Sequence, residues 1–353
     1  MNLYINGISA ISPQDTFNSN DFLSSPVDYN DRILKCVTPN YKEYINPRQL
    51  RRMSAVVKMG IATAKQALAE ASVELPDAIV TGTGMGCEAD TEKFLDSIVA
   101  NNESLLTPTA FIQSTHNTVA SQIALNLSCN NYNMTYVNRN GAFESALIDA
   151  AILANEGKNN ILAGGLDEMT KRYHYQRDLK NFWKKEEIAS LSLFDSKTSG
   201  TLAGEGSVFA VLSNQKTSNY YARLIDVASF IDIGKAELSQ ELNKLLQKHN
   251  ISQKEIDVVI TGNTGNYESD KFIDEFVNTN LQYSVQLTYK HLTGEYDTAS
   301  AFAFWLAANI LKKQTIPKVT IYKSKPIDKI KYVLIYNYHY YFKNNHNFIL
   351  LKS

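Results

Sequence analysis

Apolar and polar positions along the chain follow two alternating patterns. Asp77 and Asp257 each precede three apolar residues and then Thr-Gly, a run typical of a buried strand that ends in a turn. From Phe143 to Ala154 the apolar positions instead recur at helical spacing, and Gly157 follows as a stop signal. Strands that alternate with helices of this kind predict an α/β protein.

The two strand patterns belong to a longer internal repeat. The first copy reads DAIVTGTGMGCEADTEKF from Asp77, and the second reads DVVITGNTGNYESDKF from Asp257. In both copies a glycine-containing loop follows the Thr-Gly, and an Asp comes nine residues after the Thr. Each copy therefore predicts a buried strand, a tight turn and a helix that begins with an acidic residue.

Helical segments recur on both sides of the two copies. They are expected at 49–75 and 236–249 before the copies and at 120–127 and 299–311 after them. The period of about 180 residues is far longer than the repeats of solenoid proteins. We therefore predict two related α/β halves, residues 1–215 and 216–353, joined at the polar stretch 214–220. Chance similarity between the copies is the alternative.

A tight corner lies between a predicted strand, Asn133 to Val137, and the helix that begins near Phe143. Its residues are Arg139, Asn140 and Gly141. Many α/β enzymes place a nucleophile at such a strand-to-helix corner, with the helix N-terminus behind it. An asparagine cannot act as a nucleophile, because the lone pair of its amide nitrogen is delocalised.

Composition narrows the class of protein. The 353 residues carry 35 basic and 36 acidic side chains, with no basic block, which argues against a nucleic-acid partner. The longest apolar run, Ala299 to Leu311, is too short to span a membrane, and no signal peptide is expected. Cys36, Cys87 and Cys129 are too few and too scattered for a metal or disulfide framework. We expect a cytoplasmic globular protein without a metal or cofactor.

Four longer segments occur in a fixed order. They are NPRQLRRMSAVVKMGIATAKQAL from Asn46, GTGMG from Gly82, LAGGLDE from Leu162 and FDSKTSGTLAGEGSVFAVL from Phe194. Together they resemble the β-ketoacyl synthases, or ketosynthases, of the thiolase superfamily over nearly the whole chain. The resemblance implies an α/β class, thiolase-like duplicated αβαβα five-layer fold. It also implies a dimer whose interface includes Gln113, Ser114, His116, Asn133 and Tyr136.

The family uses a Cys-His-His set to form an acyl-enzyme and to stabilise the enolate that condenses with it. On the family pattern, Asn140 stands at the cysteine position and Gly262 at the first histidine position. KHLTGEYDTASA keeps the motif lysine as Lys290 but has Glu295 at the second histidine position. The resemblance therefore implies a catalytically inactive subunit close to the chain-length factors. Such subunits pair with an active ketosynthase in aryl polyene, flexirubin-type pigment and aromatic polyketide synthesis.

Two other family features bear on the acyl pocket. Met85 occupies the GTGMG position whose side chain closes the pocket near the dimer interface, although it would also fill an irregular gap in that interface. The family's flexible Gly-Phe-Gly-Gly gating loop is replaced around 337–345 by NYHYYFKNN, within which Asn345 is the candidate for a family asparagine. Arg48, Arg51 and Arg52, at the start of an amphipathic helix, could bind an acidic acyl carrier protein, but solvated or interface-paired arginines are the simpler interpretation.

Alternative functions stay open at this point. His116 in QSTHNTVAS could serve as a base in acyl transfer, although it could equally be an interface residue next to a helix cap. His291, one residue beyond the motif lysine, should point away from the pocket, and His174, in the charged run MTKRYHYQRDLK, is expected to be solvated surface. A non-catalytic homodimer that binds acyl chains is also compatible, because an isologous and a pseudo-symmetric interface use the same patch.

Overall fold

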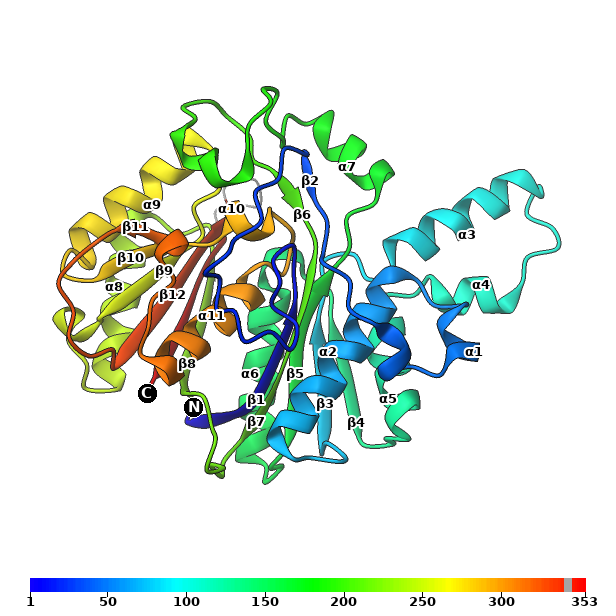
Figure 1. Cartoon of the computed structure of the whole chain (residues 1–353), viewed down its shortest axis with the longest axis horizontal. Coiled ribbons are helices and arrows are strands. Elements are labelled where there is room, and N and C mark those ends of the chain that lie inside the picture. The colour runs from blue at the N-terminus through cyan, green and yellow to red at the C-terminus, as the bar shows by residue number, and fades with distance from the viewer. Residues whose placement is uncertain (340–344) are drawn as a thin grey trace.

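One mixed β-sheet of eleven strands runs through the molecule (Figure 1). The computed structural model describes residues 1–339 and 345–353. The strand order is β11-β10-β9-β12-β13-β8-β1-β7-β5-β3-β4, and β2 pairs with β6 in a separate small sheet. The strands are β1 (Leu3–Ile11), β2 (Ile33–Leu34), β3 (Ala78–Gly82), β4 (Tyr132–Tyr136), β5 (Ile161–Asp167), β6 (Ala203–Gly204), β7 (Gly206–Ser213), β8 (Arg223–Ile231), β9 (Val258–Thr261), β10 (Val285–Thr288), β11 (Ile321–Lys323), β12 (Tyr332–His339) and β13 (Asn345–Lys352).

The strand order repeats between the two parts of the chain. Outward from the centre, the N-terminal part runs β1, β7, β5, β3, β4 and the C-terminal part runs β8, β13, β12, β9, β10. In both parts the first two pairings are antiparallel and the next two are parallel. The predicted duplication is therefore present in the topology. The domain limits of 1–215 and 216–353 stay a prediction, with β7 ending at Ser213 and β8 beginning at Arg223.

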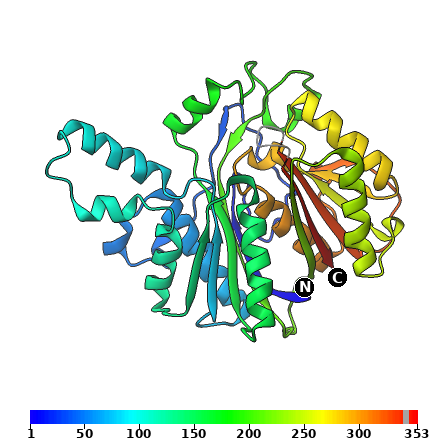
Figure 2. The ribbon, with the colours of Figure 1, turned by 180° about the vertical axis from the view of Figure 1, so that it is seen from behind.

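Helices pack in layers against the sheet. Two helices, α6 and α11, lie between its two parts: α6 contacts β3, β5 and β8, and α11 contacts β1, β7 and β12 (Figures 1 and 2). The outer faces carry α2 and α5 on one side and α8 and α9 on the other. The helices are α1 (Pro47–Leu50), α2 (Ala55–Ala71), α3 (Glu88–Ala100), α4 (Pro108–Gln113), α5 (Thr118–Leu127), α6 (Ala142–Asn155), α7 (Lys171–Asp178), α8 (Lys235–Lys248), α9 (Tyr267–Asn280), α10 (Lys290–Thr293) and α11 (Ser300–Lys313).

The apolar run 299–311 forms α11, which is buried along almost its whole length because sheet strands cover it on several sides. Within the described ranges, no helix combines the length and apolar character needed to cross a bilayer. Five short 3₁₀ helices complete the elements that the structure describes, at Tyr41–Glu43, Arg139–Gly141, Ser190–Asp195, Gln253–Glu255 and Lys318–Thr320.

One predicted helix is wrong in its continuity. The segment 49–75 was expected to be a single helix, but it holds the end of α1 and then α2, with a break around Met53. Asn46 caps α1 by accepting a hydrogen bond from Arg48 N, with Pro47 in the first turn. Ser54 has an extended backbone, so α2 starts afresh at Ala55.

A helical arm projects from the edge of the sheet (Figure 1). It consists of α3 and α4, which contact each other through Phe94 and Phe111, whose ring centroids lie 5.7 Å apart. The arm leaves several large apolar side chains exposed, among them Val99 and Ile112. It lies at the same end of the molecule as β4, the last strand of the sheet, so this end presents both an unpaired strand edge and apolar side chains.

Candidate functional site

The strand-to-helix corner is present as predicted. β4 ends at Tyr136, a 3₁₀ turn covers Arg139–Gly141, and α6 begins at Ala142. Arg139 has a φ of 54°, a left-handed conformation that is uncommon for a residue with a side chain. Asn140 follows with only 2% of its surface exposed, at the N-terminal end of α6. The corner therefore points the Asn140 side chain into the protein interior.

The Asn140 amide meets a histidine for which sequence reasoning gave no role. Asn140 Nδ2 lies 2.8 Å from Nδ1 of His339, the last residue of β12. The other ring nitrogen, Nε2, lies 2.8 Å from Nδ2 of Asn337 on the same strand. Glu295 Oε1 is 3.6 Å from His339 Nδ1. The imidazole therefore stands between residues that come from the corner, from β12 and from the segment after α10.

Gly262 belongs to the same site through Asn337. The glycine follows β9, and its backbone N–H donates to Tyr336 O. A Cβ at position 262 would overlap Asn337 Oδ1, so the asparagine side chain occupies the space that any side chain at 262 would need. The structure thus brings the three positions predicted from the family pattern, Asn140, Gly262 and Glu295, to one place around His339 and Asn337.

Lys290 and Glu295 form a buried ion pair beside the histidine. Lys290 Nζ donates to Glu295 Oε2 at 2.6 Å, and the two side chains are 0% and 9% exposed. Burial raises the pKa of the Glu295 carboxyl, and the Lys290 ammonium opposes that rise. Gly294 allows this geometry, since its φ of 68° suits glycine and a Cβ there would overlap the Ala203 carbonyl.

The hydrogen bonds around His339 define its tautomer. Burial, together with the positive charge of Lys290 and then of Arg177, lowers the pKa of His339 well below its usual range, so the ring is neutral. Asn337 Oδ1 accepts from the Tyr289 hydroxyl at 3.3 Å, which leaves its Nδ2 to donate to His339 Nε2. The ring proton is then on Nδ1.

An Nδ1–H needs an acceptor, and two unpartnered oxygens are at hand. Asn140 Oδ1 and Glu295 Oε1 are both buried and without a hydrogen bond among the described residues. Oxygen and nitrogen of an amide are assigned from their partners, and a protonated Nδ1 calls for the Asn140 oxygen on the histidine side. That assignment exchanges the two amide atoms, so that Asn140 Oδ1 takes the position 2.8 Å from His339 Nδ1, and Glu295 Oε1 lies 3.6 Å from the same nitrogen. Both ring nitrogens of His339 then have a partner, and the Asn140 NH2 takes the place of the amide atom that has none among the described residues.

The three cysteines lack the properties of a nucleophilic thiol. Cys36, Cys87 and Cys129 are free and buried. Burial raises the pKa of Cys36 and of Cys87, and nearby carboxylates add to both effects. Since the thiolate is the reactive form, these cysteines have the character of core residues.

A second charged cluster lies next to the GTGMG loop. Asp297 accepts from Arg177 at 2.9 and 3.0 Å, and Arg139 lies 3.9 Å from the same carboxylate. Asp167 accepts from Gly84 N at 2.7 Å, which fixes the start of the loop. Burial, and then the charge of Asp297, raise the pKa of Asp167 to about 6.

Met85 is partly buried behind this cluster. It packs against an apolar group that contains Tyr173, Phe182 and Trp183. Its neighbour Gly86 has a φ of 66° and passes close to the backbone of His116. The side chain therefore lies among residues of α7 and of the segment that follows it. Its role at the end of an acyl pocket stays a prediction.

The predicted interface residues differ in where their side chains go. Gln113 Nε2 donates to Arg52 O at 3.2 Å, Ser114 Oγ to Phe111 O at 2.8 Å, and Asn133 Nδ2 to Ala120 O at 3.0 Å. Tyr136 is partly buried against the core beneath β4, on the side of α6. Its hydroxyl pKa is raised by burial and then by Asp149 of α6. The first three residues of this strand, Tyr132, Asn133 and Met134, are exposed, although the Tyr132 hydroxyl donates to Asp149 Oδ2 of α6 at 3.1 Å.

The three other histidines named from sequence lie apart from the network. His116 is exposed, and no hydrogen bond or ion pair involves it among the residues that the structure describes. The expected cap of the next helix is Asn117, although its side chain makes no capping hydrogen bond. His291 is buried with Nε2 2.9 Å from Val319 O, and burial lowers its pKa to about 4. His174 stacks on Trp183, which corrects its interpretation as solvated surface.

The C-terminal prediction was partly wrong. The stretch 337–345 was read as a replaced gating loop, yet Asn337 and His339 lie within β12 and Asn345 begins β13. The remaining residues of that prediction, 340–344, lie outside the described residues. Asn345 is buried, and its Nδ2 is among the nearest atoms to the space beside Gly141. In the sequence, Asn337 and His339 share one strand face, which was the available signal for their convergence.

No group of three or more metal-ligating side chains comes together in the part of the chain that the structure describes. The candidate site instead holds one cation, one carboxylate, a neutral imidazole and two amides. These can exchange hydrogen bonds with one another, and their geometry supplies no activated nucleophile at the corner.

Comparisons with known proteins agree with this architecture. Residues 35–218 match the family model described as beta-ketoacyl synthase, N-terminal domain. No curated protein matches the sequence. Among solved structures, the ishigamide ketosynthase/chain length factor is 16% identical with a TM-score of 0.82, covering 100% of this chain and 99% of that one.

Two further structures share the fold over the whole chain. A β-ketoacyl synthase from Burkholderia phymatum is 13% identical with a TM-score of 0.83, covering 100% of this chain and 99% of the other. The ketosynthase ApeO in complex with its chain length factor ApeC, from Xenorhabdus doucetiae, is 14% identical with a TM-score of 0.74, covering 100% and 98%. The expected thiolase-like five-layer fold is thus confirmed. Because the family model spans more than half of the sequence, the chain belongs to the β-ketoacyl synthase family.

Proposed function

We propose that this chain is a ketosynthase-like subunit that performs no condensation itself. The observation that carries the proposal is the polar network around His339, which fills the corner where the family pattern would place Cys-His-His chemistry. Asn140 offers no nucleophile, and Gly262 offers no side-chain donor. Glu295 held as a carboxylate by Lys290 would repel an enolate oxyanion rather than stabilise it.

Its partner would be an active β-ketoacyl-acyl carrier protein synthase, whose acyl pocket this chain helps to shape, as in chain-length factors. The end of the sheet supports this assembly, because β4 is an unpaired edge strand with Met134 and Val137 exposed beside the apolar arm. Exposed edges of this kind are normally covered by another chain. Two of the proteins with the same fold are described as ketosynthase/chain length factor assemblies.

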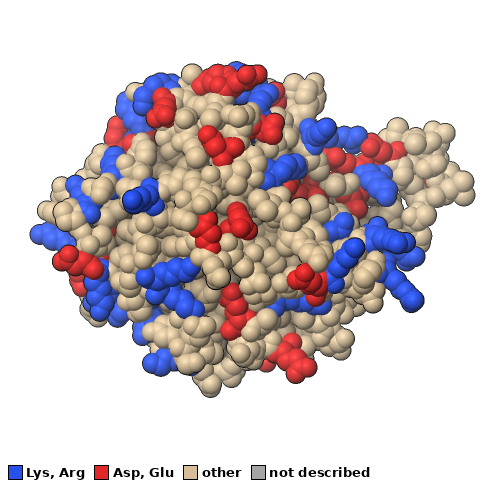
Figure 3. Space-filling model, in the orientation of Figure 1, with Lys and Arg blue, Asp and Glu red and all other residues tan. Residues whose placement is uncertain are grey.

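An acyl carrier protein would deliver the substrate to the pair. Figure 3 shows basic side chains gathered below the arm, over α1, where Arg48, Arg51 and Arg52 are exposed. No acidic side chain lies within ion-pair distance of these arginines in the described ranges. A cluster of unpaired guanidinium groups attracts an acidic partner. Polyene pigment or polyketide synthesis in the cytoplasm is the setting that the family resemblance implies.

A homodimer that binds acyl chains is the second candidate. The observation that favours it is the same unpaired β4 edge, because two copies could pair there about a two-fold axis. The mass of the assembled complex separates the two candidates.

The test is co-expression with an intact Cys-His-His ketosynthase encoded beside this gene. We expect a complex with one copy of each chain, while a dimer of this chain that excludes the ketosynthase would support the second candidate. Alone, the chain should show neither covalent acylation from acyl carrier protein nor release of carbon dioxide from malonyl carrier protein. A variant with Cys36, Cys87 and Cys129 replaced by serine is the control. Acylation that persists in this variant would identify another nucleophile and contradict the proposal.

A further inference from the structure

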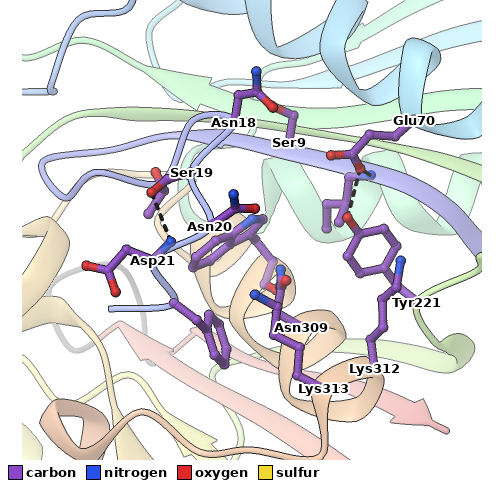
Figure 4. A pocket seen from close by; sticks show the side chains of 14 residues that line it. Ser9, Asn18, Ser19, Asn20, Asp21, Glu70, Tyr221, Asn309, Lys312 and Lys313 are labelled. Carbon is purple, nitrogen blue, oxygen red and sulfur yellow. Dashed lines mark hydrogen bonds between the residues drawn. The ribbon is translucent and has the colours of Figure 1, made fainter. Parts of the chain in front are cut away.

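A separate cavity lies where the two parts of the sheet diverge. β1 pairs with β8 only through Leu3 and Tyr4, and Ile5 still bonds to the connection before β8. Beyond Ile5 no strand of the described residues pairs with this edge of β1. The loop 12–22, the C-terminal ends of α2 and α11, and Tyr221 enclose a space of about 260 Å³ there (Figure 4). We call this space the seam cavity, since both halves of the chain contribute to its wall.

One wall of the seam cavity is negatively charged. Glu70 Oε2 accepts hydrogen bonds from Ile8 N at 3.1 Å and from the Tyr221 hydroxyl at 2.9 Å. No hydrogen bond uses Glu70 Oε1 among the described residues. In a strand, the N–H and C=O of one residue point to the same side, so the Ile8 carbonyl faces this edge as well. A carboxylate oxygen and a carbonyl oxygen form a suitable pair of acceptors for an ammonium group.

Two lysines from the end of α11 also line the cavity, and Lys312 borders the same Tyr221 side chain as Glu70. Lys312 Nζ lies 3.7 Å from the centre of the Tyr221 ring and donates to Asn219 O at 2.9 Å. Lys313 Nζ lies 4.8 Å from the Phe22 ring centre. Neither ammonium has a carboxylate within ion-pair distance in the part of the chain described. Burial lowers the pKa of Lys312, which marks it as the less solvated of the two.

Two buried polar side chains that line the cavity have oxygen atoms without a hydrogen-bond partner among the described residues. Ser9 is 4% exposed, and its Oγ is buried without a partner among the described residues. Asn309 is 6% exposed and spends its Nδ2 on Trp305 O, while no hydrogen bond uses its Oδ1. Figure 4 shows Asn20, Asn309 and Lys313 around the same space. Asp21 also lines the cavity, but its carboxylate accepts from the backbone of Ser24 and Ser25.

We propose that the seam cavity binds a free α-amino acid. Its ammonium group would lie against Glu70 Oε1 and the Ile8 carbonyl, its carboxylate against Lys312 and Lys313, and its side chain against Trp305. A zwitterion matches a site whose lining carries both a carboxylate and ammonium groups, and the cavity is smaller than those that hold drug-sized ligands. Lysines in the last turn of α11 also stabilise the helix dipole, but that role requires neither an unpaired Ser9 hydroxyl nor a cavity.

The seam cavity has no residue in common with the polar network around His339. An amino acid bound there would contact β1 and α2 from one half and α11 from the other. Occupancy would thus stabilise the junction of the halves. Binding of an amino acid in the seam cavity requires neither a ketosynthase partner nor any condensation chemistry.

Calorimetric titration of the full purified chain with each standard amino acid, followed by thermal unfolding with the same probes, tests the proposal. We expect at least one amino acid to bind with a micromolar to millimolar dissociation constant and to raise the melting temperature. Its decarboxylated amine and its deaminated acid should each bind at least about tenfold more weakly, because each loses one charge-assisted contact.

Variants locate the binding site. Glu70→Gln keeps an acceptor for Ile8 N and Tyr221 but loses the charge, and Lys313→Ala removes an exposed cation. Each should weaken binding at least about tenfold. Lys329→Ala, an exposed lysine outside the cavity, is the matched control and should change nothing. The inference would be overturned if no amino acid bound saturably. It would also be overturned if the Glu70→Gln and Lys313→Ala variants bound the amino acid as tightly as the unmodified chain.

Discussion

Replacement of Lys290 by methionine tests the charge state at the centre of the candidate site. Lys290 Nζ lies 2.6 Å from Glu295 Oε2, and the two side chains are 0% and 9% exposed. Methionine retains most of the apolar stem but leaves the Glu295 carboxylate without its cation. Removal of one partner from a buried ion pair costs about 3–5 kcal/mol, because the remaining charge has neither water nor a counter-charge.

The chain contains a matched control for this measurement. Lys244 and Glu241 also lie 2.6 Å apart, but on the surface of α8, with side chains 67% and 24% exposed. Water screens such a pair, so Lys244→Met should cost far less stability than Lys290→Met. Two pairs with equal distance and different burial therefore separate the effect of desolvation from the effect of geometry.

Urea unfolding of both variants at pH 8 and at pH 5 is the assay. In Lys290→Met the pKa of Glu295 should rise further, because burial raises it and no ammonium opposes the rise. A carboxyl whose folded pKa exceeds its unfolded pKa is destabilising above the unfolded value, so the loss should be full at pH 8 and smaller at pH 5. The double variant Lys290→Met with Glu295→Leu should recover most of the stability.

Equal costs for Lys290→Met and Lys244→Met would refute the reasoning. Glu295 would then be neutral in the native protein, and a neutral carboxyl could donate a hydrogen bond to an oxyanion. A neutral Glu295 would not repel an enolate. The measurement therefore bears on function as well as on stability.

Three other predictions follow from the structure. Met134→Asp places a charge on the exposed β4 edge and should abolish complex formation in gel filtration, while Ile321→Asp on β11, 39% exposed at the opposite edge, should not; equal behaviour of the two variants would move the interface elsewhere. Met85→Ala should lengthen the product of the assembled pair and Met85→Trp should shorten it, as measured by mass spectrometry of the acyl chains; an intact complex with unchanged products would exclude Met85 from chain-length control. Burial raises the pKa of Glu144 to about 7, so the native state loses stability as pH rises from about 4.5 to 7. Glu144→Gln should remove this pH dependence and stabilise the protein by about 3 kcal/mol at pH 8. The same dependence of unfolding free energy on pH in the variant and in the unmodified chain would contradict this assignment.

The sequence was sufficient to predict the fold. The helix from Phe143, the strands after Asp77 and Asp257, and the internal repeat all correspond to elements of the structure, because periodicity and glycine placement are local signals. The break near Met53 was not predicted, because the apolar spacing continues across it and only the extended backbone of Ser54 interrupts the helix. Tyr136 was proposed for the interface because alternation groups it with Met134, but alternation does not tell how far each side chain is covered by α6.

The candidate site could be predicted only in part. Asn140, Gly262 and Glu295 were found because motif neighbours identify their positions. His339 and Asn337 stand in no motif, and their contact with the corner depends on the register of β12 beside β9. Their position across the sheet from Asn140 is a long-range property, which a pattern along the chain does not specify.

The polar filling of the site has a physical reason in Lys290. A buried ammonium needs an anion, so an apolar residue at position 295 would leave it uncompensated, whereas Glu295 provides the charge at 2.6 Å. One carboxylate oxygen is then left over, and His339 Nδ1–H lies 3.6 Å from it.

The imidazole in turn needs a donor for Nε2, which Asn337 supplies from the space that Gly262 leaves free. Arg139 keeps its left-handed backbone although the corner presents no nucleophile, and its guanidinium bonds to the Tyr173 hydroxyl at 3.1 Å. The strain of about 1 kcal/mol is therefore a property of the β4-to-α6 connection itself.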